Sequence, residues 1–280
     1  MKPSLVSLLA ALALPACAAP PAEQPVNIGF ALQSGNAEVV CTRPVPGLNE
    51  PATLTDARLY IHDVVLLDDA GHATPVALTP SSWQRDGVVL LDFEDASGTC
   101  RGTAATNNAV VGTVPAGRYV GLGFVVGVPS PLNHTSANAE AAPLDLVAMG
   151  WSWQAGRKFI KIELDPEGGV VRAAGKPGAT WHLHLGSTGC VGDPFKGEAV
   201  SCATPNRIAV RFPAFSADAD HVVLDLATLF DGTDLGRDGG GALGCMSGPD
   251  DPDCPAVFRQ LGLKPATTQP SAFRVAANKG

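Results

Sequence analysis

Six histidines and a closely spaced pair of tryptophans are the residues of this 280-residue chain whose types and spacing suit metal chemistry. His182 and His184 occur in residues 180–185 (TWHLHL), and in a strand both imidazoles would project from one face, opposite Trp181. Two neutral imidazoles placed in this way can bind one metal ion. The alternative is a polar pair on a solvated strand face.

The other histidines occur in three different contexts. His62 belongs to an apolar strand-like run, residues 57–67, where a lone histidine is typically structural. His134 follows the turn-like segment PSPLN, and loops held by a rigid sheet are where functional groups concentrate. We expect His72 and His221 to be surface or structural residues.

Trp151 and Trp153 form the second unusual feature, in the segment MGWSW. On a strand both rings would share one face, and aromatic packing is the simple interpretation. Indole is also the most easily oxidised ordinary side chain. The pair could therefore pass an oxidising equivalent from a docked protein to a buried position, with Trp153 as the relay.

Two enzyme-like or metal-like motifs are incomplete. Residues 186–189 (GSTG) differ from the G-x-S-x-G elbow of hydrolases, because the serine is displaced by one position. Asp231 and Asp234, followed by Asp238, resemble a calcium loop but lack the glycine and final glutamate of an EF-hand. An incidental acidic turn is the simpler interpretation, and weak Ca²⁺ binding is the alternative.

The N-terminal residues predict export. Lys2 precedes an apolar stretch, residues 5–14, that is too short to span a bilayer. Leu-Pro-Ala-Cys then ends at Cys17, which predicts a lipoprotein cleavage box with Cys17 acylated; ordinary signal-peptidase cleavage is the alternative. We expect residues 1–17 to be a signal peptide and residues 18–26 an Ala/Pro-rich tether. The protein would then be periplasmic or at the cell surface, anchored by lipid to an outer membrane.

Removing Cys17 leaves an even number of cysteines. Proximity in the sequence favours the pairs Cys190–Cys202 and Cys245–Cys254, which leaves Cys41–Cys100. A metal site is the alternative, but the chain has no C-x-x-C pair, and exported thiols tend to oxidise. Each disulfide would stabilise the fold by about 2–4 kcal/mol.

The composition predicts a β-rich body rather than a helical or disordered one. Charged residues make up 16% and hydrophobic residues 45%, while 31 Gly and 24 Pro interrupt the chain throughout. The net charge of −8 without a basic cluster argues against a nucleic-acid partner. Short strand-like runs recur between turn residues, at 26–32, 57–67, 88–93, 118–126, 158–164, 180–185, 207–212 and 221–226.

These runs predict an all-β fold with one domain over residues 27–280, an antiparallel β-sandwich or irregular barrel with long loops and disulfides. In the run 158–164, Ile160 shares one face with its apolar neighbours, while Lys161 and Glu163 point the other way. The only predicted helix is short, at about 256–263 after Pro255.

An ordered set of motifs resembles the MbnP family of exported copper-binding proteins, also called metallo-mystery-pair four-Cys-motif proteins. The resemblance extends from about residue 57 to residue 263. Its motifs are RLYIHDV from Arg58, LLDFED from Leu90, GVP at 127–129 leading to Asn133-His134, PL at 143–144, MGWSWQAG from Met149 with Lys158-Phe159, HLGSTGC from His184, and GCMSG from Gly244 with Asp253-Cys254.

The resemblance implies a function and a modification. In the family, a partner di-haem protein of the MauG/bacterial cytochrome c peroxidase superfamily oxidises the first tryptophan of W-x-W to kynurenine, which Cu(I) binding requires. Here that residue would be Trp151. The family-like histidines are His62, His134 and His184, whereas His182 lies outside the family pattern and depends on strand geometry alone. Arg157 stands where the family has a tyrosine.

We therefore expect a copper(I)-binding protein of copper homeostasis or acquisition that is the substrate of an enzyme and not an enzyme itself. Opening the indole frees an aromatic amine, and this neutral nitrogen with imidazoles would favour the monovalent ion. Two alternatives are a β-sandwich copper oxidoreductase acting on a small oxidant, and a metal-free structural surface lipoprotein.

Overall fold

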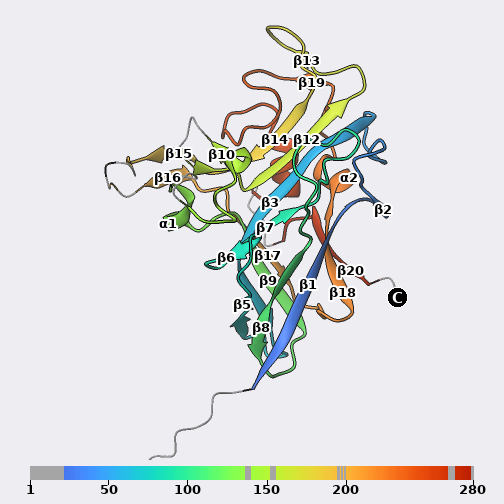
Figure 1. Cartoon of the computed structure of the whole chain (residues 1–280). Coiled ribbons are helices and arrows are strands. Elements are labelled where there is room, and N and C mark those ends of the chain that lie inside the picture. Colours follow the sequence, from blue (N-terminus) through green and yellow to red (C-terminus); the bar gives the residue numbers. More distant parts are fainter. Residues whose placement is uncertain are drawn as a thin grey trace, which may run out of the picture.

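Two β-sheets form the body of the molecule, which is a computed structural model (Figure 1). The structure describes residues 22–135, 140–151, 156–193, 196, 198, 200–263 and 269–278. The predicted signal peptide, Cys17 and Trp153 lie outside the described residues. Of the two predicted architectures, the sandwich is the one observed.

The first sheet has six strands in the order β20-β18-β1-β8-β5, with β2 also paired to β1. Their bounds are β1 (Glu23–Ser34), β2 (Ala37–Glu38), β5 (Ala77–Leu78), β8 (Ala109–Pro115), β18 (Asp220–Asp225) and β20 (Phe273–Ala277). β1 and β18 run parallel, so the sheet is mixed rather than wholly antiparallel as predicted. The two strands lie far apart in the sequence, and no hairpin turn fixes their relative direction.

β1 also begins earlier than the sequence predicted. Glu23 opens the strand, and residues 23–26 pair with β8 instead of belonging to the expected tether. Pro25 is tolerated here because β18 pairs with β1 only from Gly29 onward, so this end of the strand has a free edge.

The second sheet has eight strands, and β3 is its centre. The path β14-β12-β3-β7-β6 is joined by β4 and β9, which also pair with β3, and by β17, which pairs with β9. Their bounds are β3 (Ala52–Leu67), β4 (Ala73–Pro75), β6 (Gln84–Arg85), β7 (Val88–Asp92), β9 (Gly121–Val126), β12 (Ile160–Pro166), β14 (Trp181–Leu185) and β17 (Ile208–Phe212).

The main core lies between the two sheets. Alternating residues of β1 point into it, and Phe30 meets Phe124 of β9 edge to face with ring centroids 5.6 Å apart. A smaller core covers the outer face of the second sheet, where Tyr60 and Phe159 pack with Met149. Residues from the segment 140–151 pack over this core, and the polar side chains of Arg58 and Asp92 on the same face are buried.

Short elements complete the fold. They are α1 (Ser130–Asn133), α2 (Leu226–Leu229), α3 (Pro255–Gln260), the 3-10 helix η1 (Val147–Met149), β10 (Gly150–Trp151), β11 (Gly156–Arg157), β13 (Val171–Arg172), β15 (Thr188–Val191), β16 (Ser201–Thr204) and β19 (Arg237–Asp238). The predicted helix is α3, which begins at Pro255. Among the described residues, no helix combines the length and apolarity needed to cross a membrane.

The three disulfides connect the predicted pairs, Cys41–Cys100, Cys190–Cys202 and Cys245–Cys254. The first and third are buried with the main core. The second joins directly opposite residues of the β15–β16 hairpin, which lies with α1 and β10 on one side of the sandwich (Figure 1).

Candidate metal centre

His182 and His184 lie on one face of β14, as the strand alternation predicted, while Trp181 and Leu183 face the main core. Both imidazoles meet the same carboxylate on the neighbouring strand β12. Nε2 of His184 is 2.8 Å from Oε1 of Glu163, and Nδ1 of His182 is 3.3 Å from that oxygen. The two rings are 5.1 Å apart between centroids.

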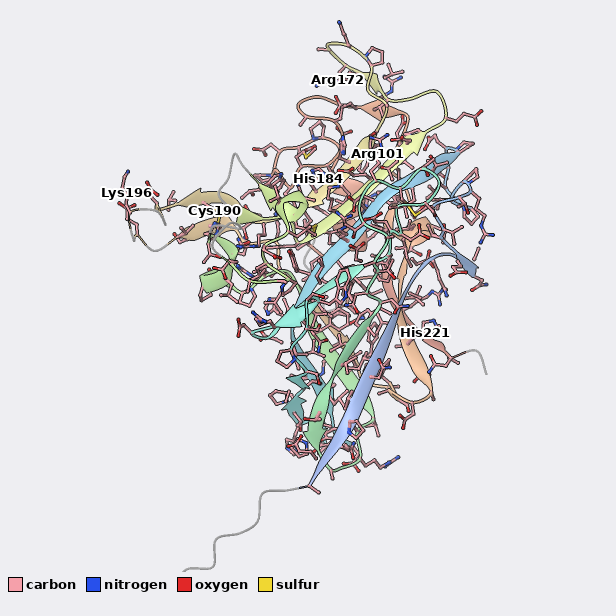
Figure 2. The ribbon with its side chains drawn as sticks, in the orientation of Figure 1. Arg101, Arg172, His184, Cys190, Lys196 and His221 are labelled. Atoms are coloured by element: carbon pink, nitrogen blue, oxygen red, sulfur yellow. A yellow bond between two sulfur atoms is a disulfide. The ribbon has the colours of Figure 1, made fainter. Side chains whose placement is uncertain are left out.

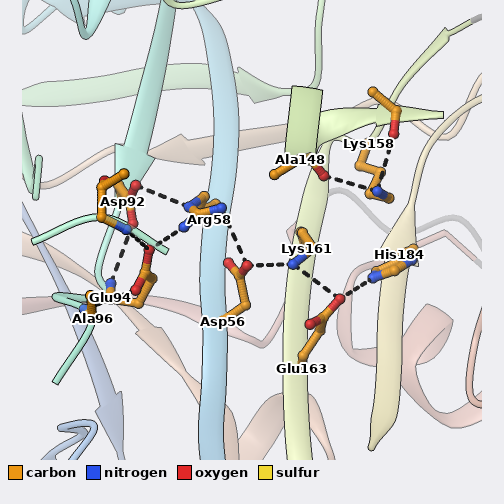
Figure 3. Close-up of polar contacts among 12 residues, drawn as sticks. Asp56, Arg58, Asp92, Glu94, Ala96, Ala148, Lys158, Lys161, Glu163 and His184 are labelled. Atoms are coloured by element: carbon orange, nitrogen blue, oxygen red, sulfur yellow. Dashed lines mark hydrogen bonds and ion pairs between the residues drawn. The ribbon is translucent and has the colours of Figure 1, made fainter. Parts of the chain in front are cut away.

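Glu163 begins a row of charged side chains that crosses the sheet (Figure 3). Nζ of Lys161 contacts both Glu163, at 3.0 Å, and Asp56. Arg58 continues the row from β3, with Nη1 3.3 Å from Asp56 and Nε 3.0 Å from Asp92; it also contacts Glu94. The β-register explains this row, because His184, Lys161, Arg58 and Asp92 are successive cross-strand neighbours.

Burial and charge set the protonation of this row. Burial raises the pKa of Asp92 to about 6 against the opposing charge of Arg58. Burial would also raise the pKa of Glu163, but its contacts with His182, His184 and Lys161 lower it well below the usual range. Burial lowers the pKa of His184 to about 4. At neutral pH the site therefore holds an anionic carboxylate and a neutral imidazole.

The indole of Trp151 lies next to this row, against the residue that follows strand β14. A Cβ atom added at Gly186 would be 2.7 Å from Cζ3 of the indole, so the ring packs directly on that glycine. Gly186 is two residues after His184, and alternate strand positions share a face. The side chain of Trp151 is buried, with 6% of the residue exposed.

His134 lies beside the hairpin that carries Trp151. It ends α1, and its ring would be 3.3 Å from a Cβ atom at Gly156, the residue that pairs with Trp151 in the β10–β11 hairpin. Paired residues of adjacent strands project to the same side, so the imidazole and the indole share one face of the hairpin. Asn133 holds this arrangement, because its Nδ2 lies 3.1 Å from Nε2 of His134 and its Oδ1 accepts a bond from the Arg157 amide.

His62 is buried on β3 with both ring nitrogens outside hydrogen-bond geometry. Its Nδ1 lies 3.0 Å from Oδ2 of Asp63, and burial lowers its pKa. Arg58 is the β3 residue in the row of His184, so His62 lies four residues further along, about 13 Å in the strand direction.

Two groups of three candidate ligands occur among the described residues with ligating atoms within 4.8 Å of one another. One contains Glu163, His182 and His184. The other contains His134, Cys190 and Cys202, but these sulfur atoms form a disulfide and are not thiolate ligands. Neither group joins His134 to His184 or contains His62, and Trp151 is the residue that links the surroundings of His134 and His184.

Two carboxylates of the acidic turn meet protein donors. Oδ1 of Asp234 accepts a bond from the Gly236 amide, and Oδ2 of Asp238 lies 3.3 Å from Nε of Arg172. Within the described part of the chain, no acidic residue of this turn belongs to a three-ligand group.

The MbnP family model matches residues 23–247. The solved structure of MbnP from Methylosinus trichosporium is 43% identical, with a TM-score of 0.85, and the match covers 92% of this chain and 100% of that chain. This chain belongs to the MbnP family. No match was found among curated proteins.

Membership of the MbnP family suggests a role in the methanobactin and copper system. The motifs that carried the resemblance converge in space: Arg58 and Asp92 form the charged row, while Trp151 and His184 lie at its end. Asp92 of the motif LLDFED therefore lies on the same sheet face as His184, on the other side of strand β3.

Glu163 is the site residue that the sequence analysis did not select. Its alternation with Ile160 and Ile162 had correctly placed it on the opposite face from the core. What the sequence did not show was that β14 pairs with β12, which puts Glu163 directly opposite His182. The signal that could have found it is an acidic residue on a polar strand face in a chain that has two histidines at alternate positions.

Proposed function

We propose that this MbnP-family protein binds Cu(I) in copper homeostasis or acquisition, at a site completed by oxidation of Trp151 to kynurenine. The observation that supports this is the position of Trp151. Its indole packs on Gly186, next to the strand that carries His184, and its backbone pairs with Gly156, which contacts His134. A new donor atom on this side chain would therefore arise in the region that contains both histidines.

The donor chemistry fits a monovalent ion. Kynurenine forms when four electrons and four protons are removed from the indole and two oxygen atoms from water are added, which cleaves the C2–C3 bond; a further water then hydrolyses the formyl group off as formate. The product carries an aromatic amine, a neutral nitrogen donor that intact indole lacks. His134 and His184 are the proposed imidazole ligands, and the lowered pKa of His184 keeps its ring neutral and able to coordinate. His62 and His182 are the further candidates.

The oxidant is proposed to be a di-haem protein of the MauG/cytochrome c peroxidase type, so the MbnP-family chain would be a substrate and not an enzyme. Trp151 is nearly inaccessible to solvent, which favours removal of electrons across the protein rather than direct contact with a haem. Trp153 would be the relay. Export, with Cys17 as a lipid anchor to the outer membrane, would place the chain where such a partner acts.

The test is to co-express the chain with its di-haem partner and measure mass and copper together. We expect the peptide containing Trp151 to gain one oxygen and lose one carbon overall, and the protein to hold one Cu(I). Trp151→Phe should abolish tight Cu(I) binding in competition with a Cu(I) chelator. Trp83→Phe is the matched control, because Trp83 packs at the edge of the smaller core and should leave binding unchanged. Copper-loaded protein with an unmodified Trp151 would refute the proposal.

A further inference from the structure

We propose that Glu163, His182 and His184 form a binding site for a divalent first-row cation such as Zn²⁺, distinct in its donors from the Cu(I) site. The inference does not depend on modification of Trp151, although both sites would use His184. Two imidazole nitrogens and one carboxylate are a donor set found around divalent metals in proteins.

The distances are close to those between ligands of one ion. Zinc binds nitrogen and oxygen ligands at about 2.1 Å, so neighbouring ligands around one ion are about 3.0–3.4 Å apart. Here Nε2 of His184 and Nδ1 of His182 lie 2.8 and 3.3 Å from Oε1 of Glu163. All three residues have ligating atoms within 4.8 Å of one another. Small side-chain rotations would open these contacts around an ion.

The sheet preorganises the three side chains. Glu163 and His182 are direct cross-strand partners on β12 and β14, and His184 is the next residue of β14 on the same face. A rigid pair of strands therefore holds all three ligands, which lowers the conformational cost of binding. Figure 3 shows the carboxylate of Glu163 directed toward His184 from the neighbouring strand.

His182 supplies a second indication. Its Nδ1 is buried, faces Glu163 at 3.3 Å, and lacks hydrogen-bond geometry. A buried nitrogen without a hydrogen bond is costly, and a metal ion would satisfy it. The side chain as a whole is 24% exposed, so an ion can reach it from solvent.

The neighbouring charges permit a cation to enter. Lys161 is the group that would be displaced from Glu163, and its Nζ also contacts Asp56, so it can keep one carboxylate partner. The anionic carboxylate favours a divalent ion, whereas the uncharged donors proposed around residue 151 favour Cu(I).

The experiment uses the full chain carrying Trp151→Phe, which removes the proposed Cu(I) site and keeps these three residues. Isothermal titration with Zn²⁺ should give one ion per chain. Adding His182→Ala or Glu163→Gln should weaken binding tenfold or more, since even outer partners of metal ligands typically contribute about 10–100-fold. His221→Ala is the control, because His221 lies on β18 in the other sheet (Figure 2). The Zn²⁺ affinity of this variant should equal that of the parent.

Thermal unfolding of each variant checks that it is folded before titration. Absence of Zn²⁺ binding by the folded parent, or equal affinity in the His182, Glu163 and His221 variants, would overturn the proposal. Cu(I) binding is measured separately, on the chain without the Trp151→Phe substitution in which residue 151 has been oxidised to kynurenine. Failure of one proposal is therefore distinguishable from failure of the other.

Discussion

Individual residues place the indole of Trp151 with little tolerance. Gly186 leaves room for the ring, because an added Cβ atom would lie only 2.7 Å from it, and a Cβ atom at Gly156 would lie in tight contact with the His134 ring, at 3.3 Å. Both glycines have φ values outside the left-handed region, so they are needed for the close approach of neighbouring groups and not for an unusual backbone conformation. Trp151 and His134 can thus pack closely because Gly186 and Gly156 have no side chains.

At Gly186 this gives a specific prediction. Gly186→Ala would place a methyl group 2.7 Å from Trp151 Cζ3 and 2.8 Å from the Arg157 carbonyl oxygen. We expect a loss of about 1–3 kcal/mol in the free energy of unfolding and a shifted tryptophan fluorescence spectrum. Gly29→Ala is the control, because its new Cβ would be 3.4 Å from the nearest atom, Cβ of His221. Equal stability of the two variants would show that the indole is not packed on Gly186.

At the scale of secondary structure, four adjacent strands carry a buried polar row on the outer face of the second sheet. β14, β12, β3 and β7 contribute His184, Lys161, Arg58 and Asp92 in register. A row of this kind is stable only while each charge has a partner, because the covering segment excludes water. The row also fixes Glu163, through Lys161, in the orientation that meets both histidines.

Arg58 is the residue on which the row depends most. Arg58→Ala would leave the buried carboxylates of Asp92 and Glu94 without their cation, at a cost of about 3–5 kcal/mol in urea unfolding at pH 8. The loss should be smaller at pH 5, because burial already raises the pKa of Asp92 to about 6 and protonation removes the unpaired charge.

The matched control is Arg101→Ala. Arg101 pairs with Asp165 at 3.2 Å but its side chain is 66% exposed, so its removal should change stability by less than about 1 kcal/mol at either pH. A pH-independent effect of Arg58→Ala would indicate lost packing of the side chain rather than unpaired charge.

The whole molecule is stabilised by strand pairing between distant segments and by disulfides that span different sequence separations. The parallel pairing of β1 with β18 joins the beginning of the described chain to its C-terminal part, and β20 extends the same sheet. Cys41–Cys100 closes a separation of 59 residues, whereas Cys190–Cys202 closes only 12 within a hairpin that projects from the sandwich.

These separations predict unequal contributions to stability. Replacing both cysteines of Cys41–Cys100 by alanine should cost about 4 kcal/mol, and the same change at Cys190–Cys202 about 1 kcal/mol less, because the shorter loop restricts the unfolded chain less. Urea unfolding of the two double variants under oxidising conditions measures the difference. An equal or larger loss for the hairpin pair would mean that it braces the main fold.

The sequence by itself determined the features that depend on local pattern. Period-2 alternation placed His182 and His184 opposite Trp181, turn residues marked most of the long strands, and spacing identified the three disulfides. Tertiary structure alone decided which strands pair. The parallel β1–β18 contact, the meeting of Glu163 with the histidines and the packing of Trp151 on Gly186 all join segments separated in the chain. Such contacts depend on strand register and on how the whole core closes, and alternation within a single segment carries no information about either.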